Sequence, residues 1–366
     1  AALGPQPSLS AYSSTSAWMF IIYFAPNLSS EGALEVILKT TIVLDAMGSD
    51  DRPQPELLGA IQATANWDIH IILVGDETQL KTALDAQPGD KSKISIVHAP
   101  EVLAMDDDIR EARSKKQNTM AVGMQLVKDG KAHAFVTAGN TGMAMYFGTK
   151  TFGLIKGVNR PCLCANFPTK NGFCTVLDIG ANAECRPDFL VQFGQMGAVY
   201  ARLMNDITNP RVGLISNGEE EHKGNELVKS AHPLMRKSVP GFIGNVEGKE
   251  IFGGEVDVAV TDGFTGNVFL KSTEAVAKLL MHTIKDSLMS STRAKIGALL
   301  AKPAFKKVRS MLDPNEIGAA PLLGLNGLVF VGHGRSNADA IVSSINQARK
   351  AIEANMLVEL QNAIKR

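Results

Sequence analysis

The sequence has few cysteines and no excess of charge of either sign. Only four cysteines occur among 366 residues, and Cys162, Cys164, Cys174 and Cys185 all fall within one short stretch. A small secreted disulfide scaffold would be denser in cysteine, and the paired C-x-x-C spacing of a zinc site is missing. We therefore expect reduced cytoplasmic thiols and no metal site. Lys plus Arg equals Asp plus Glu at 37 each, so the net charge does not favour nucleic acid as a partner.

Long hydrophobic runs are also scarce. The apolar run 17–25 is far shorter than the ~20 residues of a membrane span. No Lys or Arg precedes it as a signal peptide would require, and the Ser- and Pro-containing stretch before it is typical of unstructured chain. We predict a poorly ordered leader over residues 1–40 and a single α/β domain over residues 41–366.

Two phosphate-binding loops of nucleotide enzymes are absent. The sequence contains neither G-x-x-x-x-G-K-[ST] nor a G-x-G-x-x-G motif that opens a helix after a strand. The first absence argues against a nucleoside triphosphate ligand, and the second argues against a dinucleotide. We therefore expect no cofactor.

Short β-branched or apolar runs that end in turns of Gly, Asn, Asp, Ser or Thr recur from Thr41 onward. A helix-like segment follows each turn, and this repeated unit predicts parallel strands in an α/β fold. In an open parallel sheet the carboxyl ends of the strands meet at one edge, so we expect the turns to gather there around a ligand. One such turn is usually ordinary turn chemistry, but seven are not. The turns are 45–49, 75–76, 138–142, 178–182, 216–220, 261–267 and 332–336.

These turns are rich in groups that bind anions. Glycine turns at helix starts expose backbone N–H groups, and the helix dipole favours an anion there. Asn140, Asn182, Asn217 and Asn267 add neutral donors, which suit phosphate, a carboxylate or a developing oxyanion. His333 lies between two glycines directly after a strand, and its near-neutral pKa suits proton transfer to a leaving group.

One turn also carries charge. Glu219, Glu220 and Glu221 precede Lys223, which we interpret as a point-charge ligand for phosphate. A solvated acidic helix start explains Glu219 and Glu221 equally well.

Two basic stretches are candidates for contact with a partner. Residues 273–312 predict a basic amphipathic helical hairpin, which suits an anionic membrane surface or an acidic protein. Packing between two copies of the chain is the alternative. The second cluster, 110–116, taken alone is more often a charged helix face. The expected contact residues are Arg113, Lys115, Lys116, Lys302, Lys306, Lys307 and Arg309.

Six segments together resemble the bacterial phosphate acyltransferases that use acyl carrier protein, the PlsX family. The resemblance covers about residues 41–353. The first forty residues have no counterpart, and segment 105–110 lacks a proline that such proteins often carry there. The segments are Leu44-Asp45-Ala46-Met47-Gly48, Ala138-Gly139-Asn140-Thr141-Gly142, Leu177-Asp178-Ile179-Gly180-Ala181-Asn182, Gly218-Glu219-Glu220-Glu221, Asp262-Gly263-Phe264-Thr265-Gly266-Asn267 and Gly332-His333-Gly334.

The resemblance implies both a fold and an activity. The fold would be a three-layer α/β/α sandwich around a mostly parallel sheet, similar to phosphotransacetylase and to isocitrate and isopropylmalate dehydrogenases. The enzyme would convert fatty acyl-acyl carrier protein and inorganic phosphate into acyl phosphate and free carrier, feeding phospholipid synthesis. It would be a cytoplasmic homodimer, loosely attached to the inner face of the membrane.

For the mechanism, our hypothesis needs no covalent acyl-enzyme, because phosphate is itself an anionic nucleophile. Lys223 and the amides of 140–142 would hold phosphate, while Asn182, Asn217 or Asn267 would donate to the thioester oxyanion and His333 would protonate the departing sulfur. The role of the aspartates is open, since they could orient Lys223 or cap helices. The expected phosphate- or substrate-binding residues are Asp45, Gly48, Gly139, Asn140, Thr141, Gly142, Asp178, Gly180, Asn182, Gly218, Glu220, Asp262, Gly263, Phe264, Gly266, Gly334 and Ser336.

Several rival functions are weighed against this one. A phosphotransacylase that uses short-chain acyl coenzyme A would share the phosphate edge but would not need the basic hairpin. A dinucleotide-dependent dehydrogenase lacks its fingerprint, and a non-catalytic membrane scaffold leaves the glycine turns unexplained. An acyl-accepting thiolate at Cys185 is the minor alternative within the enzyme reading.

Overall fold

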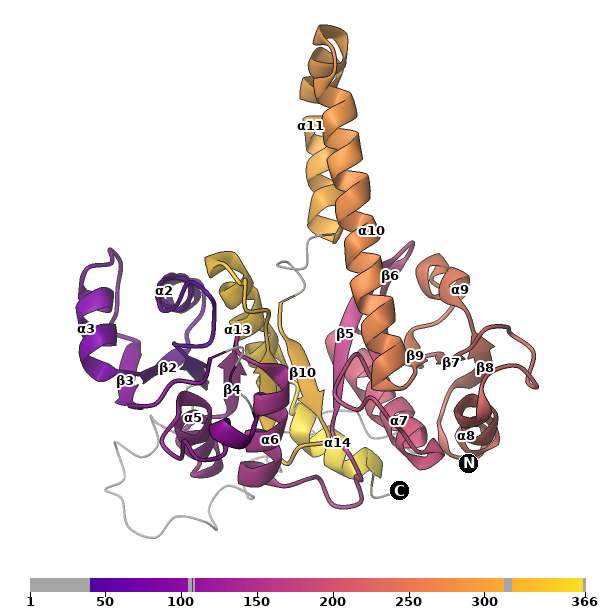
Figure 1. Cartoon of the computed structure of the whole chain (residues 1–366), viewed down its shortest axis with the longest axis horizontal. Coiled ribbons are helices and arrows are strands. Elements are labelled where there is room, and N and C mark those ends of the chain that lie inside the picture. The colour runs from indigo at the N-terminus through magenta and orange to yellow at the C-terminus, as the bar shows by residue number, and fades with distance from the viewer. Residues whose placement is uncertain (1–39, 105–106, 108, 313–317, 365–366) are drawn as a thin grey trace, which may run out of the picture. The chain divides into compact units, whose positions relative to one another are not determined.

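An eleven-stranded sheet runs through residues 40–366, which group as one compact unit (Figure 1). The computed structural model describes residues 40–104, 107, 109–312 and 318–364, so the predicted leader, including the apolar run 17–25, lies outside the described residues apart from Thr40. The strands are β1 (Thr41–Asp45), β2 (His70–Gly75), β3 (Ile94–His98), β4 (Ala134–Thr137), β5 (Cys162–Thr169), β6 (Gly172–Leu177), β7 (Val212–Ile215), β8 (Phe242–Val246), β9 (Val258–Val260), β10 (Ala320–Leu323) and β11 (Leu328–Val331).

The strand order is β3-β2-β1-β4-β11-β10-β5-β6-β9-β7-β8, and most neighbouring pairs are parallel. The exceptions lie at the centre, where β10 is antiparallel to both β11 and β5, and β5 is antiparallel to β6. Because three reversals separate β11 from β6, the strands β6, β9, β7 and β8 run opposite to the strands on the other side. The prediction of a mostly parallel sheet is confirmed, but the prediction that all carboxyl ends meet at one edge is wrong.

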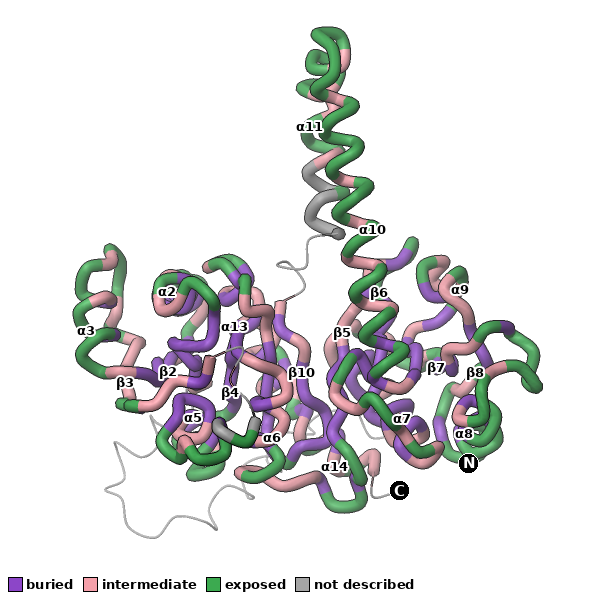
Figure 2. Tube along the Cα trace, in the orientation of Figure 1, coloured by how far each residue is buried: buried purple, intermediate pink, exposed green. Residues whose placement is uncertain are grey.

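Helices cover both faces of the sheet, which confirms the three-layer prediction. Figure 2 shows the strands buried between helices with exposed outer surfaces. One apolar core joins the sheet to α2 (Gln54–Asn66), α3 (Glu77–Asp85), α7 (Pro187–Met204), α8 (Glu226–Ser238), α13 (Ala338–Glu353) and α14 (Met356–Ile364). The second core joins the opposite face to α4 (Ile109–Ala112), α5 (Thr119–Lys128), α6 (Thr141–Phe152), α9 (Gly248–Gly253) and the first turns of α10 (Gly263–Met289).

The predicted hairpin is formed by α10 and α11 (Thr292–Leu312), which pack on each other beyond the sheet layers (Figure 1). Its first helix starts ten residues earlier than the predicted boundary at 273, directly after the turn that follows β9. The apolar face predicted for α10 is exposed, with Val276 at 54% and Leu279 at 65% exposure. No helix in the described part of the chain is both long and apolar enough to span a membrane.

Candidate active site

A cavity of about 600 Å³ lies above the central antiparallel strands. It is lined by β5, β10, α10 and the start of α6, and Tyr200 of α7 and Gln347 of α13 reach it from the helix layer on the other face of the sheet. The turns after β6 and β11 close its two ends, through Ile179 and Gly180 on one side and Gly332 and His333 on the other. The turns after β6 and β11 belong to strands that run in opposite directions, in the two halves of the sheet. Both turns nevertheless line this one cavity. Of the predicted site residues, those that line it are Thr141, Gly180, Asn267 and His333.

One face of α10 forms the wall of this cavity. The lining residues follow helical spacing, so they project from the same side of the helix. Polar and charged groups alternate with apolar groups along this face. A bound molecule can therefore meet hydrocarbon and cations on one wall. In chain order the residues include Asn267, Leu270, Lys271, Glu274, Ala277, Lys278 and Met281.

His333 is half-buried at the rim of the cavity and lies among charged side chains. Nε2 of His333 is 3.8 Å from Oε1 of Glu274, whose Oε2 is 3.4 Å from the guanidinium of Arg335. Burial lowers the pKa of His333, the carboxylate of Glu274 opposes that shift, and Arg335, Lys271 and Lys278 lower the pKa further. The imidazole is therefore neutral near pH 7, and it stands where three cations face one carboxylate. This arrangement attracts an anion.

The turns after β1, β4 and β11 pack together behind this rim. Thr137 Oγ1 donates to Oδ2 of Asp45 at 2.8 Å and accepts from the N–H of Gly139 at 2.9 Å. The N–H of Gly332 donates to the Thr137 carbonyl at 2.7 Å. A Cβ on Gly48 would lie 2.9 Å from the Gly139 nitrogen, so this approach needs glycine. The buried carboxylate of Asp45 thus fixes Thr137, whose carbonyl binds the β11 turn, and Asp45 does not line the cavity.

Side-chain caps fix the ends of these turns. Oδ1 of Asn140 accepts from the N–H of Met143 and so starts α6, whose first residue Thr141 lines the cavity. Ser336 Oγ donates to the His333 carbonyl at 2.6 Å, and the Gly334 carbonyl accepts from the N–H of Asp50 at 2.7 Å. The predicted residues of the β11 turn therefore act on the position of His333.

The turns after β6 and β9 form a second packed group. The buried carboxylate of Asp178 accepts from the N–H groups of Gly180, Ala181 and Asn182, and from the Asn182 side-chain amide at 2.9 Å. The Asn182 carbonyl in turn accepts from the N–H of Gly263 at 2.8 Å. Asp178 and Asn182 are thus engaged inside the turn that presents Gly180 to the cavity.

Asp262 and Gly266 place α10 against this group. Asp262 caps the helix, accepting from the Thr265 N–H at 2.9 Å and from its hydroxyl at 2.8 Å. Gly266 is buried against the Asp178 carbonyl, where a Cβ would overlap with the oxygen. Phe264 is 67% exposed and points away from the core. Of the roles left open for the aspartates, helix capping holds for Asp262.

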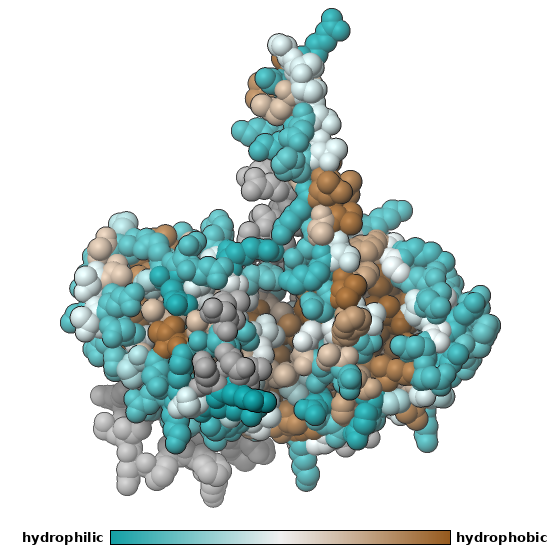
Figure 3. All heavy atoms as spheres, in the orientation of Figure 1, coloured by the Kyte–Doolittle hydropathy of each residue, from teal (hydrophilic) through white to brown (hydrophobic). Residues whose placement is uncertain are grey.

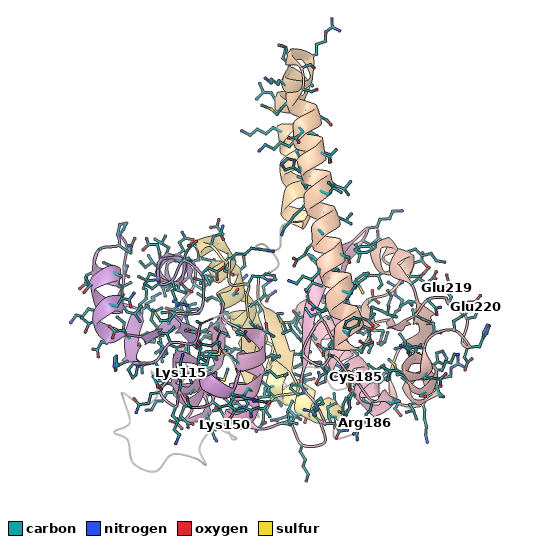
Figure 4. The ribbon with its side chains drawn as sticks, in the orientation of Figure 1. Lys115, Lys150, Cys185, Arg186, Glu219 and Glu220 are labelled. Carbon is teal, nitrogen blue, oxygen red and sulfur yellow. The ribbon has the colours of Figure 1, made fainter. Side chains whose placement is uncertain are left out.

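The charged turn after β7 lies outside the cavity. Figure 4 places Glu219 and Glu220 beside α9, on the opposite half of the sheet from Lys115 and Lys150. Oδ1 of Asn217 accepts from the N–H of Gly224 at 2.9 Å, and the N–H of Lys223 donates to the Glu220 carbonyl at 2.9 Å. The buried Gly218 sits under the Lys223 side chain. These predicted site residues form a compact local turn that contributes no lining residue to the cavity.

Glu219, Glu247 and Glu250 bring carboxylate oxygens close enough to hold a metal ion. The ammonium group of Lys249 already lies among them, 2.6 Å from Glu219, 3.1 Å from Glu247 and 3.4 Å from Glu250. A lysine cation in that position offsets part of the negative charge of the three carboxylates.

The four cysteines are all free thiols, and Cys162, Cys164 and Cys174 are buried. Burial raises the pKa of Cys185 to about 12, and neighbouring Asp178 and Asp262 add to that shift. A thiol with such a pKa is protonated at neutral pH and is a weak nucleophile. The thiolate alternative at Cys185 therefore has no support from its surroundings.

The residues predicted to contact a partner differ in their exposure and in their contacts within the chain. Lys115 is tied by a 2.6 Å ion pair to Asp107 and by a hydrogen bond to the Val102 carbonyl, whereas Lys116 is exposed. The guanidinium of Arg113 stacks 4.7 Å from the centre of the Tyr146 ring. Lys302 is exposed on α11, and the side chains of Lys306, Lys307 and Arg309 lie outside the described ones.

The residues that sequence reasoning missed are Lys271, Glu274, Lys278 and Arg335. For Lys271, Glu274 and Lys278 the signal was the spacing of three charges on one side of α10, opposite the apolar stripe. A charged helix face is usually solvated, so this spacing becomes informative only once the sheet is placed behind it.

The arrangement of the sheet and its helices is that of known acyl-transferring enzymes. The phosphotransacetylase from Streptococcus pyogenes superposes with a TM-score of 0.57 at 16% identity, covering 92% of this chain and 98% of that one. The EutD phosphotransacetylase from Staphylococcus aureus gives a TM-score of 0.54 at 15% identity, with 89% and 94% covered. At these identities the likeness establishes the fold alone.

Sequence relationships establish the family. Residues 40–359 match the family described as "Fatty acid synthesis protein", and the chain belongs to that family. The "Phosphate acyltransferase" of Pelotomaculum thermopropionicum is 45% identical over 325 residues, covering 88% of this chain and 95% of the relative. That of Clostridioides difficile is 42% identical over 327 residues, covering 89% and 96%. The resemblance seen in the turns is confirmed, and the protein is an acyltransferase.

Proposed function

We propose that this enzyme transfers a fatty acyl group from acyl carrier protein to inorganic phosphate, releasing acyl phosphate and free carrier. One observation carries the proposal: a single cavity joins a cationic rim to an apolar floor. The rim around His333 includes Lys271, Lys278 and Arg335, and the floor includes Leu163 and Phe167. Phosphate suits the first and a fatty acyl chain the second.

In this proposal phosphate binds at the rim beside the start of α6. Lys271 and Arg335 supply charge, and Thr141 at the helix start adds the positive end of the helix dipole. Lys223, the cation expected from the sequence, lies in the β7 turn, so Lys271 and Arg335 take its place. Asn267 lines the same cavity about two helical turns before Glu274, and we keep it as a candidate donor to the thioester oxygen.

The chemical step is a proton-coupled attack on the thioester. A phosphate oxygen forms a bond to the acyl carbon, the carbon–sulfur bond breaks, and the electron pair leaves on the sulfur. His333, neutral because burial lowers its pKa, accepts the proton of the attacking phosphate and passes it to the departing sulfur. Glu274 stabilises the transient imidazolium at 3.8 Å.

We further propose that the carrier, which is acidic, docks on the basic surface of α5 and α6. A groove of about 490 Å³ lies there, with Lys116, Lys128 and Lys150 among its lining residues. Complementary charge would speed the encounter between the two proteins. Lys150 lies in the last turn of α6, the helix that starts at the cavity, so the groove and the cavity are linked by one element.

The remaining partners follow from the exposed apolar surface of α10 and α11. Figure 3 shows apolar residues gathered at the base of α10, where Phe264 and Val268 are 67% and 52% exposed. We assign this base to contact with a second copy of the chain. The outer hairpin, with Leu299 and Leu300 at 71% and 79%, we assign to peripheral contact with the cytoplasmic face of an anionic membrane.

The test is release of free carrier thiol from palmitoyl-acyl carrier protein, with and without inorganic phosphate, using palmitoyl coenzyme A as a competing donor. Phosphate-dependent release that prefers the carrier supports the proposal. Release from coenzyme A alone would instead identify a phosphotransacylase that uses acyl coenzyme A.

A further inference from the structure

The cavity floor contains one small residue between two large ones. Leu163, Ala165 and Phe167 alternate along β5, so their side chains lie on the same face of the sheet. Leu163 and Phe167 are buried, at 7% and 3% exposure, whereas Ala165 between them is only half-buried. All three line the cavity. The space above Ala165 is therefore part of the cavity.

The strand register places Ala165 below the rim. Leu163 pairs with Leu322 on β10, and Ala320 on β10 pairs with Val331 on β11. By this register Ala165 is level with Val331, two residues before His333, or roughly 7 Å further into the cavity. Leu163 lies deeper by the same step. A molecule that enters at the rim and follows the floor passes over Ala165 next.

We propose that the acyl chain lies on this face of β5, with its thioester at the His333 rim, and that Ala165 determines how long a chain is accepted. The inference rests on the proposed function and adds the specificity of the same site. The floor here is apolar, with Ile179 closing the far end and Leu270 of α10 opposite. An acyl chain laid there removes its own methylenes and these side chains from water.

The test is Ala165→Leu, which fills the open space without adding a polar group. Because Ala165 has free volume above it, the larger side chain fits without displacing the core, and urea unfolding verifies that the variant folds. Ala275→Leu is the matched control, since Ala275 is exposed and outside the cavity lining. We expect kcat/KM for palmitoyl-carrier to fall on the order of tenfold or more relative to butanoyl-carrier, whose chain stops short of Ala165, in Ala165→Leu only.

Binding of palmitate and butanoate to the same variants gives a second readout that needs no turnover. Palmitate should bind at least about tenfold more weakly to Ala165→Leu, with butanoate unchanged. An unchanged ratio, or an equal loss for both chain lengths, would overturn the inference. A shift produced by Ala277→Leu instead would place the chain along α10 and overturn it too. Chain-length-dependent binding without phosphate-dependent thiol release would sink the proposed function and leave the inference standing.

Discussion

Oε1 of Glu274, on the long helix α10, lies 3.8 Å from Nε2 of His333, in the turn after β11. The two residues are 59 positions apart in the sequence and come from different layers of the fold. Glu274 is only 11% exposed, so its charge acts on the imidazole with little screening by water. The contact joins the helix that lines the cavity to the group proposed to move a proton.

The pH dependence of turnover should follow this pair. The proposed step needs neutral His333, whose pKa is lowered by burial, so activity should fall as pH drops through a value below about 6.5. Glu274 raises that pKa, so Glu274→Gln should move the acidic limb to lower pH. The kcat/KM profile of both proteins tests this, and a limb that stays or moves upward contradicts it. His333→Gln, as the reference, should lose ~10²-fold or more in kcat together with the limb.

Gly266 should tolerate no side chain. A Cβ there would overlap with the Asp178 carbonyl oxygen, and both partners are backbone atoms in packed turns. Gly266→Ala should therefore destabilise the chain by about 1–3 kcal/mol or more in urea unfolding. Gly297→Ala is the matched control, because nothing lies near its Cβ in mid-helix, and it should be neutral or stabilising by up to ~1 kcal/mol. Equal stabilities for the two variants would refute the packing argument.

The central reversals of the sheet show what the sequence could and could not supply. Seven of the parallel strands were marked by their own turn residues and were predictable one by one, whereas the edge strands β3 and β8 were not predicted. The two hairpins β5–β6 and β10–β11 each contain Asn-Gly, at Asn171-Gly172 and Asn326-Gly327, which is a hairpin signal. The two antiparallel hairpins were therefore predictable from the sequence, although the repeated strand-turn-helix pattern predicts only parallel strands. The edge at which each turn lies depends on the number of reversals, and hence on strand order, which no local pattern encodes.

The site residues also fall into those that the sequence predicted and those that it did not. His333 was predictable because a histidine between glycines after a strand is unusual. Lys271, Glu274 and Lys278 were not, because their spacing is that of any solvated helix. Asp45 and Asp178 were identified by position, but their work inside the turns depends on backbone donors such as the Leu163 N–H, which only the folded chain brings near.

The buried Glu56 should make stability depend on pH. Its carboxyl is fully buried, accepts from the Ser49 N–H at 2.9 Å, and has a second oxygen without a partner among the described residues. Burial raises the pKa of Glu56 from 4.5 to about 7, so its stabilising contribution is complete below pH 4.5 and is lost as pH rises to 7. Relative to Glu56→Gln, which stays neutral, the wild-type free energy of unfolding should fall by about 3 kcal/mol across that window. A pH-independent difference would contradict the burial argument.

Carrier docking should depend on the groove between α5 and α6. Reversing two of its charges in Lys116→Glu/Lys150→Glu should raise the KM for palmitoyl-carrier about tenfold and leave kcat unchanged, because only the encounter is weakened. The wild-type KM should also rise with salt. Lys229→Glu/Lys237→Glu, which reverses two exposed charges on α8, is the control. If both double variants give the same KM, the carrier docks elsewhere.

The exposed leucines of α11 allow membrane contact to be separated from pairing of two copies. Leu299→Asp/Leu300→Asp replaces two of the most exposed apolar side chains with charges that an anionic surface repels. We expect this variant to lose co-sedimentation with phosphatidylglycerol vesicles while its mass in solution stays the same. Val358→Asp, at an apolar position on α14 that is 51% exposed, should still bind. A variant that keeps the vesicles but falls to half the mass would show that the outer hairpin packs against a second copy, because the same apolar stripe cannot lie in lipid and in a protein interface at once.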